Sequence, residues 1–570
     1  LTVTNSTSTQ TAPTVTQASD DSWSVPGVKI TRPELYGHYI TDPANSSNYQ
    51  QGGEFFELAG APPDKLTPYI GGDVTARDVN AYVFQALAIR DRRSPFGWVG
   101  VLGEAWQVDP AGLWVRAKIF DNAAWSDGTP LTAHDYAWTY HNYTHNELVN
   151  AERTRSVTTQ LVDVKAISDK VVEFVFSEPV YSNESIALDY LPLPEHFYSG
   201  FTPEQINASS ALQLGSGMYR LPDPSYEAQW TRSDTDYVLV KNRRYWGDEQ
   251  PTFDSVRFRF ITDFGSRLQS FENGEGHLTR VTSKQYADKI ADEEFLEKAN
   301  IHVWTNVQSA YSYIAWNSGV RGDGKTTPFD DVRVRRAMTM FVDRERIIRD
   351  ELEGLGDVAY GPNPPGPATS PDVKPFPYDP AAAVALLEEA GWADTNGDNI
   401  LDKDGKNFTF TYTIPAGVEA WVRIANQISN ELRKYGVECS VEIQEWSRFS
   451  EMLKNRNFDA ISLAWSASGP ESDPRQLWHP DSADPGEGDN YSQWRNERAG
   501  EIIDQGRRTI DRDERMKLWQ ELHELIHEEQ PYTFMVRRPS IVVIDKEVGN
   551  FHEYDLNLHR IEFFLQPDVN

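Results

Sequence analysis

Cysteine is nearly missing from this sequence. Cys439 is the single cysteine among 570 residues, so no disulfide can form within the chain. It falls inside a predicted strand, where a small buried apolar residue is the common role and a reactive thiol the rare one. One cysteine does not decide between a reducing and an oxidising compartment.

Long apolar runs and positive charge are also scarce. No window of the sequence approaches the roughly 20 apolar residues that a membrane-spanning helix needs. Lys and Arg number 54 against 86 Asp and Glu, which gives a formal net charge of −32. Such a chain repels a phosphate backbone, so nucleic acid is disfavoured as a partner, whereas solubility is favoured.

Aromatic residues, by contrast, are abundant. The 17 Trp and 25 Tyr exceed what cores usually require, and aromatic-lined binding surfaces are one use for them. The hydrophobic content of 39% is that of a globular protein. A chain of this length is too long for one core, so we expect two or three domains.

The N-terminal segment has a different composition. Residues 1–20 are rich in Thr, Ser and Gln without an apolar period, which predicts a disordered tether or a frayed terminus. The chain begins at Leu1 and shows no signal peptide, which we interpret as a mature or trimmed sequence.

The second half of the chain predicts a parallel sheet. Apolar patterns alternate between strands and helices with short links, which favours an α/β lobe with right-handed crossovers. The predicted strands are 408–414, 437–443 and 459–464, and the helices are 420–435 and 446–455. In the first half we expect strands at 53–59, 113–120, 170–176, 237–241 and 256–261, and helices at 77–88, 135–143 and 264–272.

One aromatic residue stands at a predicted ligand-binding edge. The strand at 459–464 delivers Trp465 to the carboxyl end of the sheet, where open α/β sheets bind their ligands. The small-residue loop 466–470 follows. This position favours the wall of a binding cleft, and packing against a neighbouring helix is the alternative.

Several short motifs occur in a characteristic order. They are 125–135 (WSDGTPLTAHD), 193–196 (LPEH), 215–219 (GSGMY), 242–246 (NRRYW), 329–337 (FDDVRVRRA) and 386–392 (LLEEAGW). Together they resemble family 5 of the bacterial extracellular solute-binding proteins, which includes oligopeptide, dipeptide, nickel and some oligosaccharide binders. The resemblance runs from about residue 52 to the C-terminus.

The resemblance implies both an architecture and a role. The fold would be α/β and two-lobed, a type II periplasmic-binding-protein (Venus-flytrap) fold with an enlarged first lobe. Lobe I would comprise 21–308 with 535–570 returning to it, and lobe II would comprise 309–534. Such a protein captures a small solute outside the cytoplasmic membrane, in a periplasm or on a lipid anchor, and delivers it to an ABC permease and ATPase. We expect a monomer that is no enzyme and requires no cofactor.

The resemblance also implies site residues in lobe II. The family's peptide binders carry two tryptophans nineteen positions apart, and Trp446 and Trp465 have that spacing. Tyr311 and Tyr313, near a lobe crossing, are the next candidates. The remaining ones are Tyr491 and Ser468, which stands where the peptide binders place an aspartate for the peptide's amino group.

Two departures leave the ligand class open. Ser468 replaces that aspartate, and Ser462 replaces a basic residue of the oligopeptide binder. Either Glu471 or Asp473 supplies the missing charge for a peptide, because an unpaired buried ion is costly, or the ligand is a neutral oligosaccharide stacked on tryptophan.

Residues 394–405 (DTNGDNILDKDG) resemble a calcium-binding loop in part. Oxygen ligands would come from Asp394, Asn396, Asp398, Ile400 and Asp402, but Asn399 and Gly405 depart from the expected glycine and glutamate. A solvated hairpin is the alternative. A structural calcium would stabilise the protein and take no part in catalysis.

Two rival functions remain. A hydrolase could use paired carboxylates, although no G-x-S-x-G, H-E-x-x-H or Walker motif occurs. A chaperone or adhesion module would bind broadly rather than at one saturable site.

Overall fold

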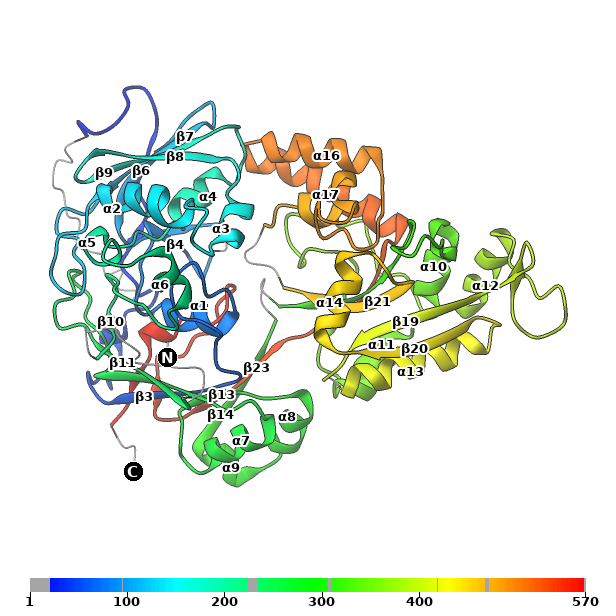
Figure 1. Ribbon diagram of the computed structural model, residues 1–570. Coiled ribbons are helices and arrows are strands. Elements are labelled where there is room, and N and C mark those ends of the chain that lie inside the picture. The colour runs from blue at the N-terminus through cyan, green and yellow to red at the C-terminus, as the bar shows by residue number, and fades with distance from the viewer. Residues whose placement is uncertain are drawn as a thin grey trace, which may run out of the picture.

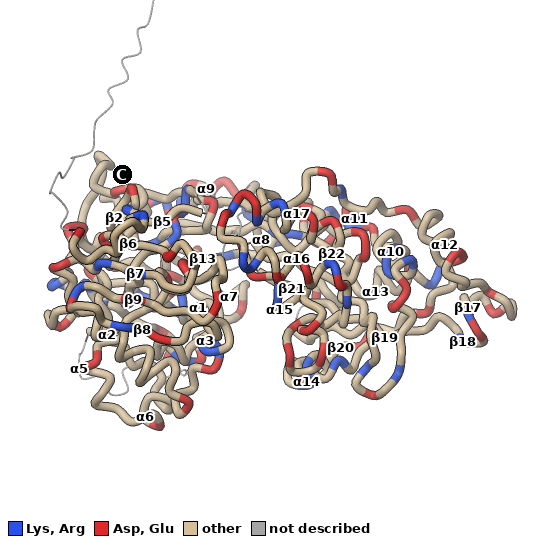
Figure 2. Tube along the Cα trace, turned by 90° about the horizontal axis from the view of Figure 1, so that it is seen from above, with Lys and Arg blue, Asp and Glu red and all other residues tan. Residues whose placement is uncertain are grey.

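The structure, a computed structural model, describes residues 21–94, 96–222, 234–305, 309–417, 419–466 and 471–567. These form two bodies joined side by side (Figure 1). We call the body that contains both the first and the last described residues lobe I and the other lobe II. Asp and Glu residues occur along the chain trace throughout both lobes (Figure 2).

Lobe I is built on two large sheets. The seven-stranded sheet takes its strands from the start, the middle and the end of the chain, in the order β10 (Tyr219–Arg220), β11 (Asp236–Lys241), β12 (Ser255–Phe260), β3 (Glu54–Ala59), β13 (Leu278–Arg280), β23 (Ser540–Asp545) and β14 (Ala299–Trp304). The five-stranded sheet has the order β1 (Ile30–Thr31), β6 (Gly103–Val108), β7 (Trp114–Ile119), β9 (Val171–Phe176) and β8 (Leu161–Ser168). Smaller pairings join β2 (Leu35–Tyr36), β5 (Trp98–Gly100) and β4 (Ala88–Arg90), and also β24 (Val548–Gly549) and β25 (Phe564–Leu565).

Lobe II is built on one six-stranded sheet. Its order is β16 (Asp357–Val358), β22 (Tyr532–Arg537), β15 (Tyr311–Trp316), β21 (Ala460–Trp465), β19 (Thr409–Pro415) and β20 (Glu438–Gln444). Strand β19 pairs in parallel with both β20 and β21, as the alternating pattern predicts. β15 and β22 join this sheet in antiparallel fashion. A hairpin of β17 (Asp402–Lys403) and β18 (Lys406–Asn407) lies at the far end of the lobe (Figure 2).

Helices cover the sheets of both lobes. In the described residues of lobe I they are α1 (Val74–Asn80), α2 (Ala133–Trp138), α3 (Glu152–Val157), α4 (Asn183–Leu188), α5 (Glu195–Tyr198), α6 (Pro203–Ala208), α7 (Phe264–Glu272), α8 (Ser283–Lys289) and α9 (Glu293–Lys298). In lobe II they are α10 (Val332–Met340), α11 (Arg344–Glu351), α12 (Pro380–Glu389), α13 (Glu419–Arg433), α14 (Trp446–Lys454), α15 (Arg475–Trp478), α16 (Glu497–Arg508) and α17 (Arg512–Glu529). None of the helices in the described ranges has the length and apolar character needed to cross a membrane.

Two adjacent stretches of chain connect the lobes. On the lobe I side Trp304 pairs with Ser540, and on the lobe II side Tyr311 pairs with Arg537. Because β22 continues to Arg537 in the lobe II sheet, the return to lobe I lies at residues 538–539, a few residues later than the boundary at 534 and 535 expected from the sequence.

The lobes also touch at Tyr181, away from these connections. The Tyr181 N–H donates a hydrogen bond to the Arg507 carbonyl at 2.9 Å. Its ring lies 6.2 Å from the Trp519 ring, edge to face, and 4.2 Å below the Arg515 guanidinium carbon. A lobe I side chain thus packs into the hydrophobic core beneath α16 and α17 of lobe II.

The predicted helix at 77–88 is wrong at both ends. α1 begins at Val74, where the Asp73 carboxylate accepts the Ala76 N–H at 2.8 Å, and ends at Asn80. Residues 82–88 are buried, and the carbonyls of Tyr82 and Val83 accept hydrogen bonds from the N–H groups of Tyr219 and Gly217. These tertiary backbone bonds replace the helical ones, so burial overrides the local helical pattern.

Candidate functional site

A cavity of about 480 Å³ lies between the lobes. Lobe I contributes α1 and parts of the segments 81–92, 189–191 and 557–561, and lobe II contributes Ser466. Ser466 directly follows β21, so the cavity opens at the carboxyl ends of the parallel strands. Its volume lies within the range of about 300–1,000 Å³ that is usual for small-molecule sites.

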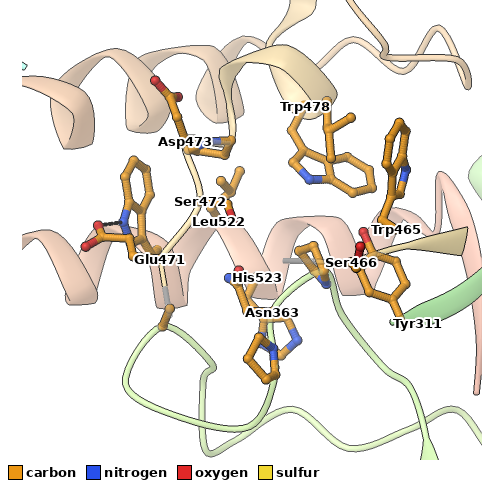
Figure 3. Close-up of a pocket in the computed structure, with 16 residues that line it drawn as sticks. Tyr311, Asn363, Trp465, Ser466, Glu471, Ser472, Asp473, Trp478, Leu522 and His523 are labelled. Carbon is orange, nitrogen blue, oxygen red and sulfur yellow. Dashed lines mark hydrogen bonds between the residues drawn. The ribbon is translucent and has the colours of Figure 1, made fainter. Parts of the chain in front are cut away.

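A smaller cavity of about 70 Å³ adjoins it within lobe II and shares Ser466. Figure 3 shows Tyr311 and Trp465 at one end of this cavity and Glu471 at the other. Trp478, Trp519, Leu522 and His523 also line it. The neighbourhood of Ser466 is therefore aromatic on the lobe II side.

Trp465 and Tyr311, both predicted from the sequence, lie together at this edge. Trp465 is half-buried, and its ring is nearly parallel to those of Tyr313 and Tyr491, at centroid distances of 6.2 and 6.1 Å. Tyr311 is buried, with the Arg537 guanidinium carbon 5.6 Å from its ring centroid. The two side chains form an aromatic wall held by neighbouring rings.

Tyr313 and Tyr491 stand behind this wall rather than on it. Tyr313 is fully buried and stacks on Tyr532 at 4.1 Å. The Tyr491 hydroxyl donates to the Asp489 carboxylate at 2.8 Å. Neither residue is among those lining the two cavities. Their contribution is to hold the Trp465 ring in place.

Of the remaining predicted site residues, Trp446 lies outside both cavities. It is 61% exposed at the start of α14 and stacks on Phe449. Ser468 falls outside the described residues. Ser462 is buried, and its hydroxyl is hydrogen-bonded to the Tyr412 hydroxyl.

The two acidic residues suggested as replacements for the missing aspartate are already paired. Glu471 receives two hydrogen bonds from Arg515, at 2.6 and 2.9 Å, and a third from the Trp519 indole N–H at 2.6 Å. Asp473 accepts the Arg507 Nε–H at 2.9 Å. Both carboxylates therefore have their counter-charge within lobe II.

On the lobe I wall, Arg560 is clamped between two carboxylates. It lies 3.0 Å from Glu57 and 3.1 Å from Asp78. Asp78 and Arg560 both line the larger cavity. Sequence analysis missed this cluster because its members lie at opposite ends of the chain and meet only when the C-terminal segment returns to lobe I.

A second group of side chains on this wall contains two neutral histidines. Arg92 donates from Nε to His559 Nδ1 at 2.8 Å, so the His559 proton is on Nε2, which faces the His38 carbonyl. Burial lowers the pKa of His559 well below its usual value and that of His38 to about 4. Both imidazoles are therefore neutral near pH 7.

Two charges on the lobe I wall have no partner among the described residues. Asp189 and Arg77 line the larger cavity, and both side chains are exposed to it. Neither makes an ion pair or a side-chain hydrogen bond with any residue in the described ranges. The cavity thus presents one open carboxylate and one open guanidinium.

The predicted calcium loop lies at the far end of lobe II, away from both cavities (Figure 2). Its carboxylates accept hydrogen bonds from the loop itself: Asp394 from Gly397 and Asn399, and Asp398 from Ile400. No cluster of three or more His, Cys, Asp or Glu suited to a metal occurs in the described ranges. Calcium binding here stays a prediction.

Comparison with known families gives one match over most of the chain. Residues 97–485 match the family model described as bacterial extracellular solute-binding proteins, family 5. The oligopeptide-binding protein AppA of Bacillus subtilis is 28% identical over 495 residues, which cover 85% of this chain and 86% of AppA. The dipeptide-binding protein of Escherichia coli is 23% identical over 414 residues, 70% of each chain.

Solved structures give the same result for the fold. The structure of AppA from Bacillus subtilis in complex with a nonapeptide superposes with a TM-score of 0.72 at 27% identity, over 91% of this chain and 99% of AppA. The substrate-binding protein CtaP of Listeria monocytogenes superposes with a TM-score of 0.75 at 19% identity, over 91% and 100% of the two chains. These likenesses confirm the predicted two-lobed α/β fold, a type II periplasmic-binding-protein fold.

Proposed function

This chain belongs to family 5 of the bacterial extracellular solute-binding proteins, and on that basis we propose that it captures a small peptide for an ABC importer. It would act outside the cytoplasmic membrane as a monomer and present the peptide to the importer's permease and ATPase subunits. The names of two similar proteins, an oligopeptide-binding and a dipeptide-binding protein, support peptides as the ligand class. Because the family consists of binding proteins, we expect the peptide to be released chemically unchanged.

The interlobe cavity is the observation that carries this proposal. It has the volume of a small-molecule site, and residues of both lobes line it. The lobes are joined by two short adjacent connections, which is the arrangement that hinge closure needs. A solute held on lobe I would be covered when Ser466 and the aromatic wall of Trp465 and Tyr311 approach it.

The charges of the cavity favour a peptide over a neutral oligosaccharide. A sugar would bury Asp189 and Arg77 without supplying a counter-charge, and burying an unpaired ion is costly. A peptide with free termini carries both charges. The sugar hypothesis also relied on Trp446 together with Trp465, and Trp446 lies outside the cavities.

A ligand screen tests the proposal directly. Purified protein is heated with a library of di- to pentapeptides with free termini and, separately, with a library of oligosaccharides. A compound that binds only the folded state raises the melting temperature. We expect hits among the peptides, which mass spectrometry should recover intact. An oligosaccharide hit with no peptide hit would contradict the proposal, and cleaved peptide would contradict a pure binding role.

Closure is tested with the same hits by small-angle scattering. We expect the radius of gyration to decrease when a peptide hit is added. Binding without compaction would show that the lobes do not close on the ligand.

A further inference from the structure

Asp189 occupies an unusual position for a structural carboxylate. It follows α4 as its C-cap residue, where its N–H donates to the Ser185 carbonyl at 2.9 Å. The C-terminal end of a helix carries partial negative charge, so a carboxylate there gains nothing from the helix. Its side chain lies in the larger cavity instead of pairing with a neighbour.

The electrostatic surroundings of Asp189 leave its charge incompletely balanced. Burial raises the pKa of Asp189 to about 6, and the positive charge of Arg90 opposes that shift only in part. Arg90 is itself held elsewhere: it donates to the Ser185 hydroxyl at 2.6 Å, and its guanidinium carbon lies 3.7 Å from the Trp98 ring centroid. Asp189 is accessible to solvent although protein surrounds it, which is the environment of a carboxylate inside an open cavity.

The other carboxylates that line the two cavities are already neutralised. Asp78 pairs with Arg560, Glu471 with Arg515, and Asp473 with Arg507. The remaining charged or titratable side chains on the wall of the larger cavity are Arg77, Arg92, His38, His559 and the neutral Tyr82. Asp189 is therefore the one lining carboxylate that is free to receive a cation from outside the chain, among the residues described.

We infer that Asp189, on lobe I, binds the ammonium group of the captured peptide. This inference rests on the proposed peptide function and names the residue that binds the peptide's positively charged group. The N-terminal α-amino group and a lysine side chain share this chemistry. Either would form a charge-assisted hydrogen bond with the carboxylate in a site partly shielded from water.

The test uses three mixed-sequence pools of di- to pentapeptides: lysine-free with free amino ends, lysine-free with N-acetyl ends, and lysine-containing with N-acetyl ends. Apparent affinities are measured by thermal-shift titration at pH 7.5. The proteins are the wild type, Asp189→Asn, and the control Asp288→Asn, which changes an exposed carboxylate on α8 that is paired at 3.5 Å with Lys284.

We expect Asp189→Asn to weaken binding of the free-amino pool about 10- to 100-fold, as loss of a hydrogen bond to a charged group does. N-acetylation of the lysine-free pool should weaken wild-type binding to a similar degree. For Asp189→Asn, the acetylated and the free-amino pools should bind with nearly the same affinity, because the interaction that acetylation removes is already lost. Asp288→Asn should match the wild type. Recovery of affinity in the acetylated lysine pool would identify the side-chain ammonium as the bound group.

Two results would overturn the inference while leaving peptide capture intact. One is that the wild type binds all three pools with the same affinity, whether or not the peptides are acetylated or contain lysine. The other is an equal loss of all three pools in Asp189→Asn, which would indicate a structural role. If no pool binds the wild type, the peptide function and this inference fall together. Because Asp189 makes no ion pair or side-chain hydrogen bond with the described residues and burial disfavours its charged form, Asp189→Asn should not lower the melting temperature of the empty protein at pH 7.5.

Discussion

The ion pair between Glu471 and Arg515 should be a main stabilising element of lobe II, and Glu471→Gln tests this. The side chains of Glu471 and Arg515 are 9% and 7% exposed. Two short hydrogen bonds join them, and the Trp519 indole donates a third. Glutamine keeps the shape and an acceptor for Trp519 but removes the charge, so Arg515 would be left buried without its counter-ion.

The expected loss follows from that uncompensated charge. Removing one partner of a buried ion pair costs about 3–5 kcal/mol. In a domain the size of lobe II, 1 kcal/mol lowers the melting temperature by about 2–4 °C. Differential scanning calorimetry should therefore show the transition of lobe II about 6–20 °C lower in Glu471→Gln. The double variant Glu471→Gln/Arg515→Met should regain at least half of this loss, because no buried charge remains.

A surface ion pair provides the control. Glu501 lies 3.0 Å from Arg498 on α16 and is 66% exposed, so Glu501→Gln should change the melting temperature by about 2 °C or less. A melting temperature of Glu471→Gln within 1 °C of the wild type would refute the reasoning. If that variant instead lost peptide affinity without losing stability, Glu471 would be a ligand-binding residue and the pairing with Arg515 incidental.

Four further outcomes are expected. Trp465→Ala should weaken peptide binding about 30-fold or more in calorimetric titration, as loss of a buried aromatic anchor does, whereas Trp446→Ala should bind normally; equal effects would contradict the aromatic wall. Because the pKa of ligand-free Asp189 is about 6, its carboxylate is protonated as the pH falls from 7.5 to 5, so affinity for free-amino peptides should fall over that window in the wild type and stay flat in Asp189→Asn. The same raised pKa means that protonated Asp189 stabilises the empty fold at low pH, a contribution that is lost as the pH rises from about 4 to 6. For residues 394–405, calcium binding predicts a melting temperature that rises with added calcium and falls again with a chelator. An unchanged melting temperature would favour the solvated hairpin, in which loop N–H groups bond to Asp394.

Local pattern was a good guide where the chain is regular. The segment 408–464 predicts three strands and two helices, and the observed elements differ from them by at most two residues at any end. The helix expected at 77–88 ends early because residues 82–88 are buried and the carbonyls of Tyr82 and Val83 are hydrogen-bonded to the backbone near Tyr219. Local propensity contains no information about a partner some 140 residues away.

The site was predictable only on its lobe II side. Trp465 could be found because strand ends are readable from periodicity and because the family's spacing points to it. Asp189 could not be found, since nothing in its sequence neighbourhood distinguishes it from the other 85 acidic residues. What makes it a candidate is the lack of a partner, and partners such as Arg560 for Asp78 are brought together only by the fold.

Under the proposed function, the two lobes would divide recognition between charge and shape, and this division would link ligand binding to closure. The lobe II carboxylates near the cavity are paired with lobe II arginines, and lobe II contributes Ser466, Trp465 and Tyr311 to the cavity walls. The charged side chains without an ion-pair partner among the described residues, Asp189 and Arg77, are on lobe I. In the open form an ion pair with Asp189 is weakened by water. When lobe II covers the site, water is displaced and the same ion pair strengthens, because electrostatic attraction grows as the local dielectric falls. A peptide carrying the matching charge would therefore stabilise the closed form more than an uncharged solute of the same size, which would gain only the contacts with the aromatic wall.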